Sequence, residues 1–107
     1  FKGICRLLVM YFTYLLRCGD GSLYCGYTTD IGKRMDQHKA GKGAKYVKAK
    51  GYKRLEFYIS SASKSDAMKF EAHIKKLLKK EKEDLLKGQT RALDELGLDY
   101  EIGLIVE

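Results

Sequence analysis

The fold is decided by the stretch Tyr24-Cys25-Gly26-Tyr27-Thr28-Thr29-Asp30-Ile31-Gly32-Lys33-Arg34-Met35-Asp36-Gln37-His38. Its first residues alternate between two faces, which predicts a strand over roughly residues 22–28. The side chains at 28–30 are good helix N-caps, so we predict a helix over roughly residues 30–40. That helix should stop at Gly41, because glycine readily adopts the backbone conformation that ends helices.

Two polar side chains share one face of the predicted helix. Arg34 and His38 are four residues apart, which places them one turn apart at the edge of the apolar side that carries Ile31. A purely structural helix has little reason to place a cation and an imidazole there. The preceding strand adds a phenol at Tyr24. At Gly26 it has no side chain, so a backbone or a ligand can approach closely.

A second β-type run lies upstream, over roughly residues 11–17. The turn-rich residues 18–22 between the two runs predict a β-hairpin. We expect a three-residue loop that ends in a left-handed glycine at Gly21, and a pairing that places Tyr14 opposite Tyr24. Both phenols would then project from the same face of the sheet.

The remainder of the chain completes a small α+β fold. We predict a third strand over 54–60, a second helix that opens at 63–66, and a short helix over 79–87. Residues 89–99 predict a helical turn, and residues 100–106 are compatible with a terminal strand or an unpaired tail. The expected order β-β-α-β-α-α gives a small three-stranded antiparallel sheet flanked by helices.

The second helix breaks its own apolar pattern at Glu71. Its apolar side chains recur at helical spacing at Ala67, Phe70, Ile74, Leu77 and Leu78. Glu71 falls within this stripe, and a carboxylate that faces a core needs a bound cation or an ion pair. Two interpretations stay open: a functional carboxylate, or a residue at the edge of the stripe that pairs with Lys75.

The net charge of +7 is concentrated in one segment of the 107-residue chain. Residues 39–54 hold seven basic side chains and no acid, with Tyr46 and Tyr52 interleaved. Such a segment suits a phosphate backbone with bases or sugars beside it, although a solvated lysine-rich loop has the same composition. The candidate nucleic-acid-binding residues are Lys42, Lys45, Tyr46, Lys48, Lys50 and Lys53.

Length and composition limit the classes of protein. The chain has room for one compact domain, expected over residues 10–88, with an N-terminal extension over 1–9 and a C-terminal extension over 89–107. No apolar run is long enough to span a membrane. The three cysteines show no metal-binding spacing and are expected to be buried thiols in a reducing cytoplasm.

The spacing of these residues resembles the GIY-YIG nuclease domain. Phe12-Thr13-Tyr14 stands in the place of the GIY motif and Tyr24-Cys25-Gly26 in the place of YIG, and Arg34 and His38 follow at the right spacing. The likeness is strongest to the small single-domain bacterial members, the YazA/YhbQ-like subfamily, over roughly residues 10–86. It implies a three-stranded antiparallel sheet flanked by helices.

The resemblance also implies roles for particular residues. The matching catalytic positions are Tyr14, Tyr24, Arg34, His38 and Glu71. Glu71 matches the metal-binding glutamate, which would hold one Mg²⁺ or Mn²⁺ ion, and Gly26 matches the structural motif glycine. Arg34 offers a charged fork for the scissile phosphate, and a tyrosine would serve as general base. Which tyrosine acts, and whether His38 relays the proton, stays open.

The leading interpretation is a metal-dependent endonuclease that hydrolyses phosphodiester bonds in structured or damaged DNA, in repair or recombination. The alternatives are a catalytically weak or inactive nucleic-acid-binding module and a subunit that docks on a protein through the helix at 79–86. Many family members carry an asparagine a dozen or more residues after the glutamate, and this chain contains none. We expect a bacterial cytoplasmic monomer with DNA as partner and no membrane, and leave RNA and a targeting protein open.

Overall fold

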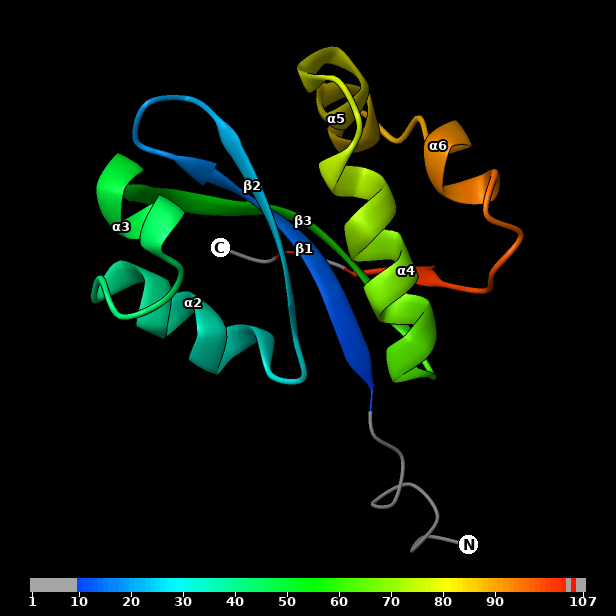
Figure 1. The fold of residues 1–107 in the computed structure, drawn as a ribbon, viewed down its shortest axis with the longest axis horizontal. Helices are drawn as coiled ribbons and strands as arrows, with labels where there is room; N and C mark the ends of the chain where they lie inside the picture. Colours follow the sequence, from blue (N-terminus) through cyan, green and yellow to red (C-terminus); the bar gives the residue numbers. More distant parts are fainter. Residues whose placement is uncertain (1–9, 104, 106–107) are drawn as a thin grey trace, which may run out of the picture.

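The computed structural model describes residues 10–103 and 105, which form a four-stranded antiparallel sheet with helices packed on it (Figure 1). The elements in chain order are β1 (Tyr11–Cys18), β2 (Leu23–Thr28), α2 (Ile31–Lys39), α3 (Lys45–Lys50), β3 (Tyr52–Ser61), α4 (Lys64–Lys75), α5 (Lys79–Leu86), α6 (Arg91–Asp94) and β4 (Glu101–Ile102). The strand order is β2-β1-β3-β4. The predicted α+β fold is confirmed, and β4 adds a short fourth strand to the three expected.

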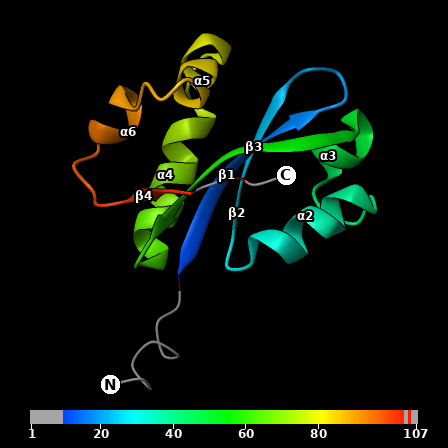
Figure 2. The same ribbon diagram turned by 180° about the vertical axis from the view of Figure 1, so that it is seen from behind.

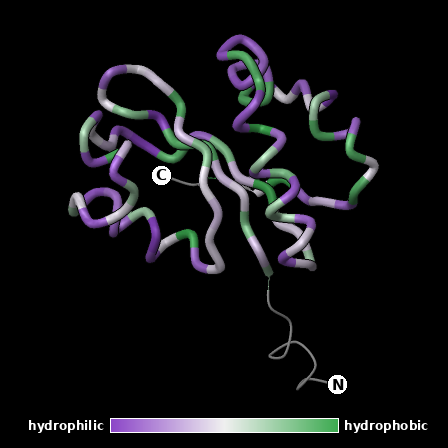
Figure 3. Tube along the Cα trace, viewed as in Figure 1, coloured by the Kyte–Doolittle hydropathy of each residue, from purple (hydrophilic) through white to green (hydrophobic). Residues whose placement is uncertain are grey.

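Helices cover both faces of the sheet. In Figures 1 and 2, α2 and α3 lie on one side of the strands and α4, α5 and α6 lie on the other. The inner strand β1 is therefore covered on both faces, and its residues 13–16 are all buried. Figure 3 shows mostly neutral and hydrophobic colours along the central strands, with the hydrophilic colour mainly on the outer elements. Within the described residues, no helix is long and apolar enough to cross a bilayer.

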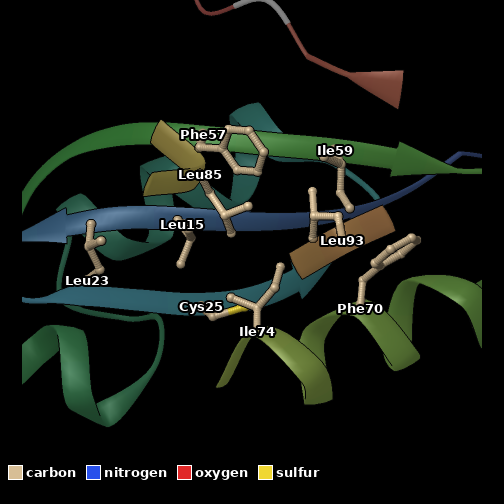
Figure 4. Packing of buried hydrophobic residues seen from close by; sticks show 9 residues of the cluster. All are labelled: Leu15, Leu23, Cys25, Phe57, Ile59, Phe70, Ile74, Leu85 and Leu93. Atoms are coloured by element: carbon tan, nitrogen blue, oxygen red, sulfur yellow. The ribbon is translucent and has the colours of Figure 1, made fainter. Parts of the chain in front are cut away.

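The larger core lies between the sheet and the layer formed by α4 to α6. Its buried members, labelled in Figure 4, are Leu15, Leu23, Cys25, Phe57, Ile59, Phe70, Ile74, Leu85 and Leu93. The strand side chains point toward α4, from which Phe70 and Ile74 face them. Leu93 of α6 is 0% exposed in this cluster, so residues on both sides of position 88 pack into one core.

A smaller cluster lies between the other face of the sheet and α2 and α3. Its buried members are Tyr14, Leu16, Cys18, Met35 and Val47. This cluster accounts for α3, which the sequence pattern did not predict. The helix has only six residues, but Val47 anchors it with 1% of its surface exposed. Cys18 and Cys25 are buried free thiols, as expected, whereas Cys5 lies outside the described residues.

The predicted pairing of the β1–β2 hairpin is wrong by two residues. Tyr14 pairs with Gly26, and Tyr24 pairs with Leu16. The loop has the expected left-handed glycine, since Gly21 has a φ of 89°. Because that loop spans residues 19–21, its closing pair is Cys18 with Ser22, and this sets the observed register. A shift of two keeps every side chain on its face, so both phenols still project from the same side.

The helix starts agree with the predicted caps, but one helix end does not. The Asp30 side chain accepts a hydrogen bond from the Lys33 backbone N–H, and Ser63 accepts one from that of Asp66. Helix α4 ends at Lys75, before the last predicted stripe residues. Leu78 is therefore not part of the apolar stripe: it precedes α5 and is 71% exposed.

Candidate active site

Tyr14 and His38 form a buried pair where β1 meets α2. The Tyr14 hydroxyl shares a 2.8 Å hydrogen bond with His38 Nε2, and the two residues are 1% and 3% exposed. Burial is the main reason why the pKa of Tyr14 lies well above its usual value, and the nearby Tyr24 adds to this, whereas Arg34 opposes it. Tyr14 is therefore a neutral hydrogen-bonding group at pH 7, with His38 as its partner.

The His38 ring is enclosed on its other side by the loop after α2. A Cβ atom on Gly43 would overlap His38 Nδ1, so the glycine backbone lies against the ring. Nδ1 is buried and has no hydrogen-bond partner among the described residues. Burial, and then the charge of Arg34, lower the pKa of His38, which keeps the ring neutral. A neutral ring can accept or donate the proton that it shares with Tyr14.

Tyr24 lies on the edge strand β2, where charges from both helical layers reach it. Its ring centroid lies 6.3 Å from that of Tyr14 and 5.8 Å from that of His38. Burial has the largest effect on the pKa of Tyr24 and raises it. Three charges follow in order of size: Lys75 of α4 lowers this pKa, Glu71 of α4 raises it and Arg34 of α2 lowers it. The phenol is only half-buried, so it is more open to solvent than Tyr14.

Arg34 keeps part of its guanidinium without a partner. One terminal nitrogen donates to the Gln37 side chain at 3.1 Å, while Nε is buried and has no hydrogen-bond partner in the described part of the chain. The positive charge lowers the pKa of both Tyr14 and Tyr24. The structure therefore places a permanent cation beside the two phenols.

Glu71 forms the ion pair with Lys75 that was one of the two sequence-based interpretations. The Lys75 Nζ and a Glu71 carboxylate oxygen are 3.2 Å apart. The Glu71 side chain is only 15% exposed, so the carboxylate is not on the outer surface. Its backbone carbonyl accepts a weak hydrogen bond from the Cys25 thiol at 3.9 Å, which holds this part of α4 against β2. The ion pair of the structural interpretation is therefore present, and the carboxylate that takes part in it is largely enclosed.

A divalent ion would find a single protein carboxylate at this place. The described residues contain no group of three or more His, Cys, Asp or Glu side chains that would hold an ion by themselves. Mg²⁺ commonly takes one or two carboxylates and keeps several waters, so Glu71 fits such a hydrated ion. The ammonium of Lys75 occupies one side of that carboxylate and would have to move or share it.

The predicted nucleic-acid-binding residues divide into two places. Tyr46 of α3 stacks on Tyr24, with ring centroids 5.8 Å apart and planes 22° apart, and the Lys50 ammonium lies 5.9 Å from the Tyr46 ring. Lys42, Lys45 and Lys48 are exposed on α3 and the loop before it. Lys53 lies apart from them, in a groove of about 510 Å³ between α2 and β3.

Comparison with known proteins identifies the family of this chain. The family model of the GIY-YIG catalytic domain matches residues 10–84. The chain belongs to this family. This is a family of nucleases, whose proteins generally use a divalent metal. Membership implies a nucleic-acid substrate.

The relatives of this GIY-YIG domain include small bacterial proteins. It is 46% identical over 86 residues to a UPF0213 protein of Yersinia pestis, a match that covers 80% of this chain and 90% of the relative. A UPF0213 protein of Cronobacter sakazakii is 46% identical over 79 residues, which cover 74% of this chain and 83% of that one. The solution NMR structure of a UPF0213 protein from Bacillus halodurans is 38% identical, covers 84% of this chain and 99% of that one, and has a TM-score of 0.49.

Two features of this GIY-YIG domain were not predicted. Lys75 was considered only as a structural partner of Glu71, yet it also has the largest effect of any nearby charge on the pKa of Tyr24. The stacking of Tyr46 on Tyr24 depends on α3, a helix too short for a periodic signal. The one available clue was Val47, an apolar residue within the basic segment.

Proposed function

We propose that this GIY-YIG domain is a metal-dependent endonuclease that hydrolyses phosphodiester bonds in DNA. The observation that supports it most is the position of Tyr24, a half-buried phenol between the two helical layers. Its pKa is affected by the charge of Arg34 in one layer and by that of Glu71 in the other. In this proposal Tyr24 would be the proton acceptor, Arg34 the cation for the phosphate and Glu71 the hard oxygen ligand. Hydrolysis of a phosphodiester needs these three functions together.

The two tyrosines would have different roles in this reaction. Tyr24, as a phenolate, would take a proton from the attacking water while the water oxygen bonds to phosphorus and the bond to the leaving oxygen breaks. Tyr14 is almost fully buried and hydrogen-bonded to His38, so this pair would position the site rather than contact water. Arg34, whose charge already acts on both phenols, would bind the phosphate oxygens through its guanidinium.

Glu71 is the residue that would hold the ion. When bound there, a divalent ion would stabilise charge on the phosphate and leaving oxygens and offset the effect of Glu71 on Tyr24. That second effect matters because a phenol normally titrates near pH 10, and burial raises the pKa of Tyr24 further. Lys75 and Arg34 already act in the favourable direction, since both lower that pKa.

The biological setting belongs to the same proposal. We place the activity in the cytoplasm, on structured or damaged DNA during repair or recombination, with the domain acting as a monomer. The exposed lysines of α3 would contact the DNA backbone beside the site. RNA as substrate and a partner protein that supplies targeting are compatible with the same surface.

Cleavage of plasmid and branched DNA tests the proposal, with Mg²⁺, with Mn²⁺ and with a chelator. We expect nicking that needs the ion and falls roughly 100-fold or more in Glu71→Gln, the size of effect seen when a group that stabilises transition-state charge is lost. Glu95→Gln is the matched control, because Glu95 is a 59% exposed carboxylate that directly follows α6 and pairs with His73 of α4, outside the site. Equal activity of the two variants would rule out the role of Glu71.

A nucleic-acid-binding module without turnover is the second candidate. It is favoured by the Glu71–Lys75 ion pair, in which the carboxylate already has a cation. This candidate predicts that wild type and Glu71→Gln bind DNA equally and that neither nicks it with any divalent ion. Binding would then depend steeply on salt and on the lysines of residues 42–50.

A further inference from the structure

A small hollow lies beside the candidate active site, outside the five predicted catalytic residues. It has a volume of about 170 Å³ and is lined by Ser22, Leu23, Tyr46, Lys79 and Lys82. These residues come from the β1–β2 hairpin, α3 and α5, so three elements distant in sequence meet there. A water takes up about 30 Å³ in the liquid, so the hollow is large enough for a phosphate group.

One wall of the hollow is joined directly to the site. The Tyr46 ring stacks on Tyr24, and its hydroxyl donates a 3.0 Å hydrogen bond to the Ser22 hydroxyl. The Ser22 hydroxyl in turn donates to Asp20 at 2.6 Å. Asp20 is the acid on this side, and its other oxygen lies 3.6 Å from Lys50. This wall therefore holds Tyr46 in place and carries no unneutralised negative charge.

The opposite wall is cationic and lacks an anion. Lys79 and Lys82 are three residues apart on α5, so they share a face of that helix. Lys82 is half-buried, and within the described part of the chain its side chain has neither an ion pair nor a hydrogen bond. The acid one helical turn after Lys79 is Glu83, and its two oxygens already accept from Arg17 at 2.6 and 2.9 Å. Two lysines on one helix face, beside a hollow, attract an anion of the right size.

We propose that this hollow binds a phosphate of the nucleic-acid strand next to the cleaved phosphodiester. Lys79 and Lys82 pair with its oxygens, and the 42% exposed Tyr46 contacts the adjacent base or sugar. The inference rests on the proposed function, since it assumes that the strand passes Tyr24. It gives α5 a nucleic-acid role in place of the protein-docking role considered from the sequence.

Direct binding in the presence of chelator tests this subsite without any cleavage. The affinity for a fluorescent single-stranded oligonucleotide is measured against salt for wild type, for Lys79→Ala/Lys82→Ala and for Lys80→Ala/Lys87→Ala. The last pair is the matched control, because it removes the same charge from exposed positions of the same helix region that do not line the hollow. The variant Lys79→Gln/Lys82→Gln repeats the test with longer side chains, and thermal unfolding checks that each variant is folded.

We expect the Lys79/Lys82 variant to bind several-fold more weakly at about 0.1 M salt, with a salt slope smaller by roughly 0.7, the value for one phosphate of a single strand. The control should keep the wild-type slope. Equal slopes for the two variants overturn the proposal. Loss of inorganic phosphate binding with unchanged oligonucleotide binding also overturns it, because the hollow would then hold a free anion. Because no cleavage is involved, an inactive wild type would refute the endonuclease and leave this result intact.

Discussion

At the scale of single residues, Gly26 decides where the Tyr14 phenol lies. A Cβ atom at Gly26 would overlap the Tyr14 hydroxyl and lie 3.0 Å from the Tyr24 ring. We therefore expect Gly26→Ala to displace Tyr14 from His38 and to lower the free energy of unfolding by roughly 1–3 kcal/mol, the range for overpacking a core. Urea unfolding followed by circular dichroism measures this loss.

The control for this prediction is a glycine with free space. A Cβ at Gly32 of α2 would meet nothing closer than an Asp30 oxygen at 3.8 Å. Gly32→Ala should therefore stabilise the protein by about 0.5–1 kcal/mol, because alanine favours a helix over glycine. If the two substitutions change stability in the same direction, the contact with Tyr14 is not what excludes a side chain at position 26.

His38 should make stability depend on pH in a predictable direction. Its pKa is lowered in the folded protein by burial and then by Arg34, so the folded state resists protonation. Below about pH 6.5 the unfolded chain binds a proton at this residue that the folded chain does not, so the free energy of unfolding falls with acidity. The contribution of neutral His38 to the free energy of unfolding is fully present above pH 6.5. It disappears as the pH drops through the lower pKa that His38 has in the folded state.

Chemical unfolding at pH 7.5 and 5.5 checks this direction. In His38→Gln the part of the decline that comes from His38 should disappear. The free energies of unfolding at the two pH values should therefore differ less than in wild type. His73→Gln is the matched control, because His73 lies on α4 and contacts Glu95 at 3.8 Å, away from the phenols. A wild-type decline that survives unchanged in His38→Gln contradicts the assignment.

Side-chain faces could be predicted here, but residue contacts could not. Alternation fixes which face a strand residue occupies, so Tyr14 and Tyr24 were expected on one face, and they lie there with centroids 6.3 Å apart. The register depends instead on where the loop closes, and a shift of two residues leaves the alternation unchanged. The contact between Tyr14 and Gly26 was therefore not visible in the pattern.

At the scale of elements, Arg17 ties the sheet to α5. Its guanidinium donates to Glu56 of β3 at 2.9 Å and to both oxygens of Glu83 of α5 at 2.6 and 2.9 Å, and the Arg17 side chain is 15% exposed. Arg17→Met keeps the apolar stem but removes the arginine from the partly buried Glu83 carboxylate, whereas Glu56 keeps its pair with Arg54. We expect it to lower the free energy of unfolding by about 2–3 kcal/mol.

A neighbouring arginine provides the comparison. Arg54 pairs with the same Glu56 at 3.1 Å, but its side chain is 45% exposed. Exposed ion pairs contribute about 0–1 kcal/mol, so Arg54→Met should have a small effect on urea unfolding. Similar losses in the two variants would show that α5 is held by its apolar contacts, such as Leu85, rather than by Arg17.

Long or well-capped elements were predictable, and short ones were not. Helices α2 and α4 begin at Asp30 and Ser63, as their capping side chains indicated. Helix α3 has six residues and no side-chain cap, so its stability comes from Val47 packing under the sheet, which no local pattern encodes. The end of α4 at Lys75 was missed for a related reason, since Leu77 and Leu78 continue the apolar spacing after the helix has stopped.

At the scale of the whole molecule, the basic segment serves two surfaces. Lys50 lies 5.9 Å from the Tyr46 ring, next to the candidate active site. Lys53 lines the separate groove between α2 and β3 together with Lys39. The two positions are three residues apart in sequence and have the same charge, so composition treats them as equal. Only the path of the chain through α3 and into β3 separates them.

This separation predicts unequal effects on nucleic-acid binding. Lys50→Ala removes a cation beside Tyr46 and also frees the Asp20 carboxylate 3.6 Å away, so an approaching phosphate loses an attraction and gains a repulsion. Lys53→Ala removes the same charge from the other surface, where salt screens it from the strand beyond about 10 Å at 0.1 M. Titration of a single-stranded oligonucleotide at several salt concentrations should show a slope smaller by roughly 0.7 in Lys50→Ala and unchanged in Lys53→Ala. A loss in Lys53→Ala alone would place the strand in the α2–β3 groove, away from Tyr24.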